Sequence, residues 1–158
     1  MTEDWGAILV VDDDAEMREL VHDVCKERGH QIMTAGSGQE ALKLLAEQDY
    51  AVVVTDLRMK GMQGTELLTE IRRLYPDIGV ILMTGFGSVD TAVEAMKRGA
   101  SDYLTKPVKN DELVRVVERS IREASLRREV NRLRREVQRS TAFIRSSARA
   151  NRCRRYSI

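Results

Sequence analysis

Apolar runs that suit buried strands alternate with stretches of helical periodicity five times along this 158-residue chain. The helical stretches repeat apolar residues at spacings of three and four, as Met17, Leu20, Val21 and Val24 do. Parallel strands need crossover connections, which the intervening helices supply. We therefore expect an α/β fold, a doubly wound parallel sheet of five strands. The expected strands are residues 7–11, 31–35, 50–55, 79–83 and 102–105.

Polar side chains follow four of these runs, at the point where each strand is expected to end. Asp12, Asp13 and Asp14 follow the first strand, Asp56 the third, Thr84 the fourth, and Lys106 with Pro107 the fifth. The carboxyl ends of parallel strands meet at one edge of the sheet, where open α/β sheets hold their ligands. The pattern predicts one crevice that gathers carboxylates, a hydroxyl and an ammonium.

Crowded carboxylates need a nearby positive charge, because two of them about 4 Å apart repel by about 4 kcal/mol at an effective dielectric of about 20. The charge can come from Lys106 or from a divalent cation, and oxygen ligands with room for water favour Mg²⁺ over a caged Ca²⁺. A cation, a lysine and a hydroxyl around Asp56 suit phosphoryl transfer to that carboxylate. No His or Cys follows a strand, which argues against an acyl-transfer triad.

Four segments together resemble the receiver domain of two-component response regulators, over roughly residues 6–123. They are residues 8–14 (ILVVDDD), 54–64 (VTDLRMKGMQG), 83–85 (MTG) and 103–107 (YLTKP). The resemblance implies a flavodoxin-like sheet with strand order 2-1-3-4-5 and phosphorylation of Asp56 by a sensor histidine kinase. It also implies that Lys106 and Thr84 contact the phosphoryl group.

The same resemblance implies a Mg²⁺ site and a switch. Asp13, Asp56 and the backbone carbonyl of Arg58 would bind the metal directly, and Asp12 through water, whereas Asp14 reads better as a helix-capping acid. Thr84 would move toward the phosphate and the aromatic ring of Tyr103 would turn inward behind it. Such a switch is a two-state element that the added charge biases.

Lys60 departs from the family pattern, which commonly has proline at this position. Proline fixes φ and reduces the entropy of the unfolded chain, so its absence is expected to soften the loop by about 0.4–1 kcal/mol. The lysine also brings a cation near the acidic crevice.

The net charge of +1 conceals two regions of opposite sign. Residues 1–107 hold 11 basic and 19 acidic residues, a net charge of −8, and residues 108–158 hold 15 and 6, a net charge of +9. We expect a receiver domain over residues 1–123, a helical or coiled-coil linker over 124–140 and a basic, disordered tail over 141–158. The tail has a second reading as a nonspecific contact to nucleic acid phosphates.

A heptad stripe marks the expected linker, with apolar residues at spacings of four, three and four. It forms a candidate dimer seam between two copies of the chain, consisting of Leu126, Val130, Leu133 and Val137. The plain alternative is that the last helix of the receiver simply continues as a charged, solvated helix. The layout also resembles receivers of NtrC-like activators that work with sigma-54, in which a helical linker leads to an ATPase domain.

The sequence has no GxxxxGK[ST] phosphate-binding loop of such an ATPase and no helix-turn-helix unit. Either it is part of a longer protein, or it acts without that output domain. No run of about 18 apolar residues suggests a membrane span. We expect a cytoplasmic protein in which Cys25 is an ordinary small residue on a helix.

Three classes of function are consistent with these residues. The leading prediction is a phosphoacceptor switch that controls an output such as transcription, and that is not an enzyme in the usual sense. The second is a phosphate-ester hydrolase of the aspartyl-phosphate type, against which Arg58 stands where that class has a second acid. The third is a dimerisation module with a vestigial site.

Overall fold

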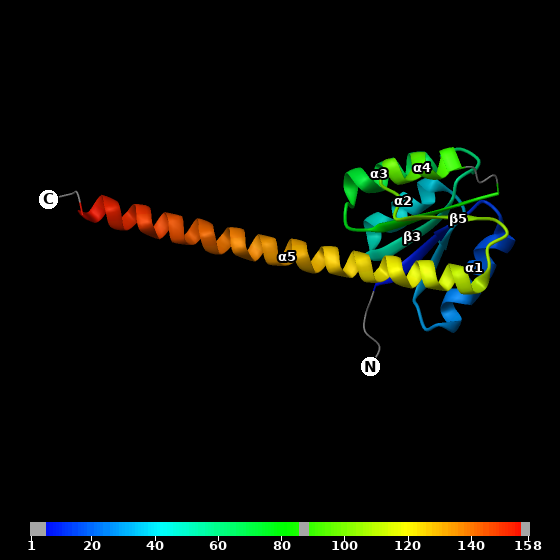
Figure 1. Cartoon of the computed structure of the whole chain (residues 1–158), viewed down its shortest axis with the longest axis horizontal. Helices are drawn as coiled ribbons and strands as arrows, with labels where there is room; N and C mark the ends of the chain where they lie inside the picture. Colours follow the sequence, from blue (N-terminus) through cyan, green and yellow to red (C-terminus); the bar gives the residue numbers. More distant parts are fainter. Residues whose placement is uncertain (1–5, 86–88, 156–158) are drawn as a thin grey trace. The chain divides into compact units, whose positions relative to one another are not determined.

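A computed structural model describes the backbone of residues 6–85 and 89–155, and the side chains of these segments up to residue 141 (Figure 1). Strands and helices alternate throughout. The strands are β1 (Ala7–Val11), β2 (Ile32–Ala35), β3 (Tyr50–Asp56), β4 (Gly79–Thr84) and β5 (Asp102–Thr105). The helices are α1 (Ala15–Glu27), α2 (Gly38–Glu47), α3 (Gly64–Leu74), α4 (Val89–Lys97) and α5 (Asn110–Arg155).

The five strands form one parallel sheet in the order β2-β1-β3-β4-β5, which confirms the predicted fold class and strand order. β3 is central, and all seven of its residues are buried, as its near-continuous apolar sequence predicted. Two strands end one residue later than expected, because Asp56 and Thr84 are their last residues rather than the first residues of the loops. The sequence also predicts that the fourth helix starts near Ser88, which could cap it; that residue lies outside the described ones.

Helices cover both faces of the sheet (Figure 1). α1 and α5 pack on one face, where Val21 and Val117 meet Ile8, Val10 and Ile81. α2, α3 and α4 pack on the other face. The residues of that second core include Leu9, Val53, Leu82, Ala41, Leu45, Leu67, Leu68, Ile71 and Ala95. Because successive residues of a strand point to opposite faces, each strand contributes to both cores.

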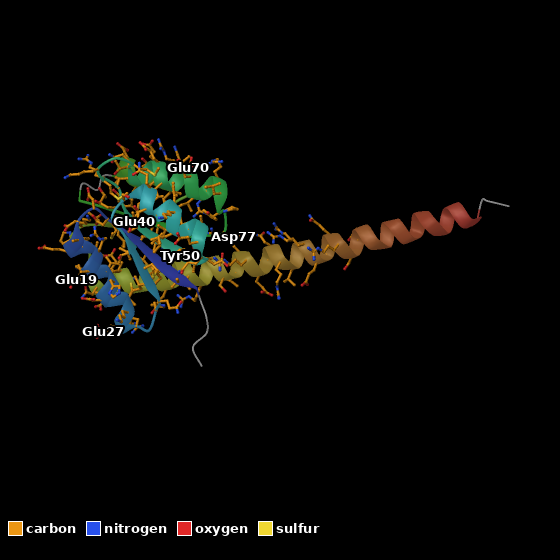
Figure 2. All side chains as sticks on the ribbon, turned by 180° about the vertical axis from the view of Figure 1, so that it is seen from behind. Glu19, Glu27, Glu40, Tyr50, Glu70 and Asp77 are labelled. Atoms are coloured by element: carbon orange, nitrogen blue, oxygen red, sulfur yellow. The ribbon has the colours of Figure 1, made fainter. Side chains whose placement is uncertain are left out.

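Polar residues begin the first two helices and cover their outer surfaces. The Asp14 side chain accepts a hydrogen bond from the Glu16 N–H at 3.0 Å, and so caps α1 as predicted. The Ser37 hydroxyl accepts from the Glu40 N–H and caps α2 in the same way. Acidic side chains such as Glu19 and Glu27 of α1 are exposed on the outside (Figure 2).

The chain divides into two compact units, residues 1–125 and 126–158. The second unit is helical to Arg155, through the segment that the sequence predicted to be a disordered tail. Its described apolar residues Leu126, Val130, Leu133 and Val137 are all exposed. No described helix is both long enough and apolar enough to cross a membrane. The boundaries of a functional linker and tail stay predictions.

Cys25 lies in the core between α1 and the sheet with only 1% of its surface exposed. Burial, with a smaller contribution from the charge of Glu118, raises the pKa of its thiol to about 11. A thiolate reacts and a thiol does not, so Cys25 should be inert at neutral pH while the chain is folded.

We expect the folded Cys153→Ser variant to react with a thiol-specific disulfide reagent at pH 8 at least about a hundredfold more slowly than the same protein in denaturant, where the thiol regains an ordinary pKa. The absorbance of the released thiol measures both rates. Equal rates in the two conditions would contradict the buried position of Cys25.

Candidate functional site

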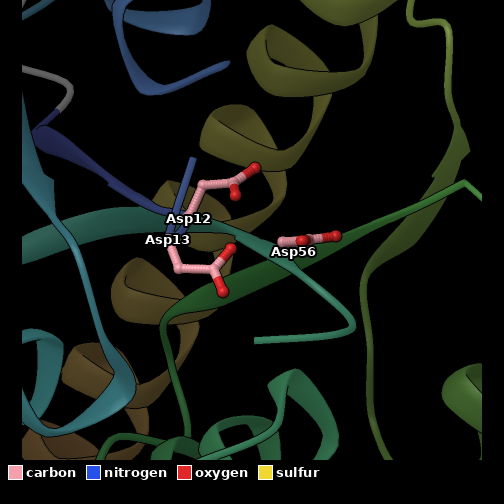
Figure 3. Close-up of side chains that lie close together, drawn as sticks. All are labelled: Asp12, Asp13 and Asp56. Carbon is pink, nitrogen blue, oxygen red and sulfur yellow. The ribbon is translucent and has the colours of Figure 1, made fainter. Parts of the chain in front are cut away.

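Parallel pairing brings two aspartates side by side at the carboxyl edge of the sheet. Val11 of β1 is opposite Thr55 of β3, so that the next residues, Asp12 and Asp56, are neighbours. One carboxylate oxygen from each of Asp12, Asp13 and Asp56 lies within 4.8 Å of the other two (Figure 3). The predicted convergence of these three acids is confirmed.

Lys106 enters the crevice from the end of β5. Its Nζ lies 3.4 Å from Asp12 Oδ2 and 3.3 Å from Asp56 Oδ1. Its backbone N–H donates to the carbonyl oxygen of Thr84 at 2.7 Å, which ties the loop after β5 to the end of β4. A single ammonium therefore compensates two carboxylates from two other strands.

Burial and charge act in opposite directions in this crevice. Asp12 has no exposed surface, and burial raises the pKa of its carboxyl, helped by the charge of Asp56. The Asp14 N–H, which donates to Asp12 Oδ1 at 3.0 Å, and the ammonium of Lys106 oppose that rise. Burial alone would lower the pKa of Lys106, but the two aspartates outweigh it and the pKa of the ammonium is raised. Desolvation of the carboxylates and repulsion between them therefore cost free energy in this crevice, and a bound cation would reduce that cost.

The acids differ in exposure. Asp56 is 8% exposed and Asp12 fully buried, whereas Asp13 lies in the exposed loop after β1. The Arg18 guanidinium on α1 donates to the backbone carbonyl of Asp12 at 2.6 Å and helps to hold the end of β1. Its spacing of six residues from Asp12 fits no pattern that would have predicted this contact.

The loop between β3 and α3 passes beside the acids. Gly64 begins α3 so close to β3 that a Cβ there would lie 2.3 Å from the carbonyl oxygen of Asp56, so no other residue fits without a shift. The Lys60 N–H donates to Asp13 Oδ2 at 3.1 Å, and Gln63 Nε2 donates to the Met59 carbonyl at 3.0 Å. Sequence reasoning treated Lys60 as a missing proline and missed that a non-proline residue supplies an N–H there.

Three further predicted residues lie at or near the same edge of the sheet. Thr84 is 1% exposed at the end of β4, and Arg58 is exposed two residues after Asp56. Tyr103 on β5 is half-buried, and its hydroxyl lies 3.2 Å from the Thr91 hydroxyl on α4. That partner of Tyr103 was not foreseen, because the two residues are linked by no sequence spacing typical of a contact.

An acidic crevice with one lysine at the carboxyl edge of a doubly wound sheet is the arrangement expected of a phosphoacceptor domain. The family model "Response regulator receiver domain" matches residues 8–118. The chain belongs to this family. The three acids are typical of the metal site of receivers, whose phosphoryl donors are histidine kinases.

Relatives and solved structures agree with this assignment. The chain is 43% identical over 112 residues to "Response regulator protein FleR" of Pseudomonas aeruginosa, covering 71% of this chain and 24% of the relative. It is 42% identical over 121 residues to "Transcriptional regulatory protein ZraR" of Escherichia coli, covering 77% and 27%. A receiver domain structure from Clostridium thermocellum matches with a TM-score of 0.72 and 34% identity, covering 77% of this chain and 98% of that one. The chain thus spans about a quarter of the length of these curated relatives.

The raised pKa of Asp12 predicts that its charge destabilises the metal-free fold. A carboxyl whose pKa is higher in the folded state is favoured when protonated, so it loses stability for the fold as the pH rises above the unfolded value of 3.8. The Asp12→Asn variant should therefore have a free energy of unfolding about 0.5–2 kcal/mol higher than that of the wild type at pH 7 in EDTA. The gain should shrink toward zero as the pH falls below about 4.

Calorimetric unfolding at several pH values measures this difference, with Asp49→Asn, an exposed acid remote from the crevice, as the control. A gain that stays constant down to pH 3 would show that the charge of Asp12 is not its origin.

Proposed function

We propose that this chain accepts a phosphoryl group on Asp56 from a sensor histidine kinase, with Mg²⁺ bound, and passes the signal on by a change of conformation. The observation that carries the proposal is the position of Asp56, whose Oδ1 lies 3.3 Å from Lys106 Nζ beside two further carboxylates. Membership of the receiver family supports a transfer from the kinase to this chain.

The fit of a magnesium ion rests on the chemistry of its donors. Carboxylates of Asp13 and Asp56, with the backbone carbonyl of Arg58, offer the hard oxygen ligands that Mg²⁺ prefers, and Asp12 would act through water. When bound, the ion supplies positive charge that offsets the repulsion among the acids and the phosphoryl oxygens.

Asp56 is the proposed nucleophile. One of its carboxylate oxygens forms a bond to phosphorus while the bond from phosphorus to the kinase histidine nitrogen breaks, and the electron pair leaves with the imidazole. Lys106 would then pair with a phosphoryl oxygen, and the hydroxyl of Thr84 would donate to another. Movement of Thr84 would leave space behind it for the ring of Tyr103, which must first give up the contact of its hydroxyl with Thr91.

We further infer that the output is transcriptional and that the protein acts in the cytoplasm. A relative of 42% identity carries the name "Transcriptional regulatory protein", and this chain spans 27% of its length. An output through a sigma-54-dependent ATPase domain beyond the receiver follows from the resemblance of the linker.

A homodimer through residues 126–137 completes the proposal. Four apolar side chains with 44–65% exposure repeat at heptad spacing, and each gains free energy by burial against a second copy. Valine at one seam position and leucine at the other favour two parallel strands. In that arrangement Glu129 beside the seam would face Arg134 of the partner subunit, which adds an attractive pair.

Phosphorylation is tested with acetyl phosphate and Mg²⁺. We expect the intact mass to rise by one phosphoryl group in the wild type and in Asp49→Asn, but not in Asp56→Asn or in EDTA, because the nucleophile or the cation is then missing. Intact-protein mass spectrometry measures the adduct.

Other outcomes identify the competing functions. Continuous release of phosphate over many turnovers would indicate a hydrolase. Absence of any adduct on the wild type would indicate a vestigial site and overturn the proposal.

The seam is tested by replacing both leucines. We expect Leu126→Ser with Leu133→Ser to raise the dimer dissociation constant at least about tenfold, since burial of each leucine contributes about 1.5–3 kcal/mol. Sedimentation equilibrium measures the constant, with Arg135→Ser on the outer face of the heptad as the matched control. An unchanged constant for the double variant would exclude this seam.

A further inference from the structure

The carboxylate of Asp13 is held in place by a hydrogen bond that a proline at position 60 would not allow. Asp13 is exposed and lies among like charges, so that repulsion from Asp12 and Asp56 would favour turning its side chain toward water. The Lys60 N–H donates to its Oδ2 at 3.1 Å and opposes that rotation. A carboxylate oxygen can accept more than one bond, so this contact leaves Asp13 able to bind a cation.

The peptide unit that makes this contact is hydrogen-bonded at both ends. The N–H belongs to Lys60, and the carbonyl of the same peptide belongs to Met59 and accepts from Gln63 Nε2 at 3.0 Å. A donor at the carbonyl end fixes the peptide plane and polarises the N–H, which strengthens the bond to Asp13. Gln63, Met59, Lys60 and Asp13 thus form one continuous chain of hydrogen bonds.

The side chain of Gln63 bonds to the Met59 carbonyl instead of capping α3. Gln63 is the residue before α3, where a side chain ordinarily caps the helix, yet it makes no capping hydrogen bond. Its amide is directed instead to the Met59 carbonyl. Met59 is 4% exposed, with its Sδ 4.0 Å from the Thr55 hydroxyl, so the peptide is anchored on the buried side as well.

We propose that Gln63 is a positioning residue that acts through the Met59–Lys60 peptide to hold Asp13 ready for Mg²⁺. This inference rests on the proposed magnesium site and deepens it. Hydrogen bonds of the loop replace the stiffness that a proline supplies elsewhere in the family.

The test uses calorimetric titration of the unphosphorylated protein with Mg²⁺. Gln63→Leu keeps the bulk of the side chain but removes the donor, and should weaken binding about tenfold, as loss of a partner that orients a metal ligand does. Gln48→Leu, the same change at an exposed residue between α2 and β3, at the opposite end of β3 from the loop, should leave the affinity unchanged. Lys60→Ala keeps the backbone N–H, so its affinity for Mg²⁺ should lie within about twofold of that of the wild type. The proposed contact uses that N–H and not the ammonium of the lysine side chain.

A double-variant cycle separates this role from general support of the loop. Lys60→Pro removes the N–H, so in that background Gln63→Leu should cause no further loss of affinity, because the chain to Asp13 is already broken. Thermal unfolding in EDTA should differ little between Gln63→Leu and the wild type, which a purely structural role for Gln63 would not permit.

Two results overturn the inference: wild-type affinity in Gln63→Leu, or an equal loss from Gln63→Leu with and without proline at position 60. If Lys60→Pro does not fold, the comparison of Gln63→Leu with Gln48→Leu and Lys60→Ala is sufficient to test the inference. Failure of the wild type itself to bind Mg²⁺ would refute the proposed metal site, and is thereby distinguished from failure of the role of Gln63.

Discussion

The parallel pairing of β1 with β3 places two carboxylates next to each other. The rest of the site compensates for their repulsion. Because Val11 and Thr55 are paired, Asp12 and Asp56 leave the sheet side by side, in a place where Asp12 has no contact with solvent. Their repulsion is met by one ammonium, which Lys106 brings from β5. Three carboxylates meet there and Lys106 pairs with two of them, so the crevice retains an affinity for a further cation.

The apolar cores on both faces of the sheet supply the stability that offsets the cost of the clustered carboxylates. Apolar side chains of the strands pack against α1 and α5 on one face and against α2, α3 and α4 on the other, and their burial offsets the unfavourable charge at one edge. The stabilising burial is thus spread through the sheet, whereas the unfavourable electrostatic energy is concentrated where the strands end. Unfavourable charge confined to a functional edge is common in proteins whose activity needs it.

Two contacts near the crevice bear directly on the proposed site and switch. The Lys60 N–H anchors Asp13, with Gln63 supporting the same peptide from its carbonyl end. The hydroxyl of Tyr103 lies against Thr91 of α4, so that the residue proposed to turn inward has a defined partner to leave. In the proposed function, the first contact bears on how a cation would be held and the second on how phosphorylation of Asp56 would affect α4.

The alternation of apolar runs and helical periodicity was enough to predict the α/β class, the parallel sheet and the four elements that deliver Asp12, Asp56, Thr84 and Lys106 to one edge. This prediction from the sequence was correct because strands buried on both faces need long apolar runs, and parallel strands need helices between them. Periodicity did not reveal where the strands end, the partner of Tyr103, or the bond from Lys60 to Asp13. Those depend on distances between residues 12 to 47 positions apart in the chain, which only packing in three dimensions determines.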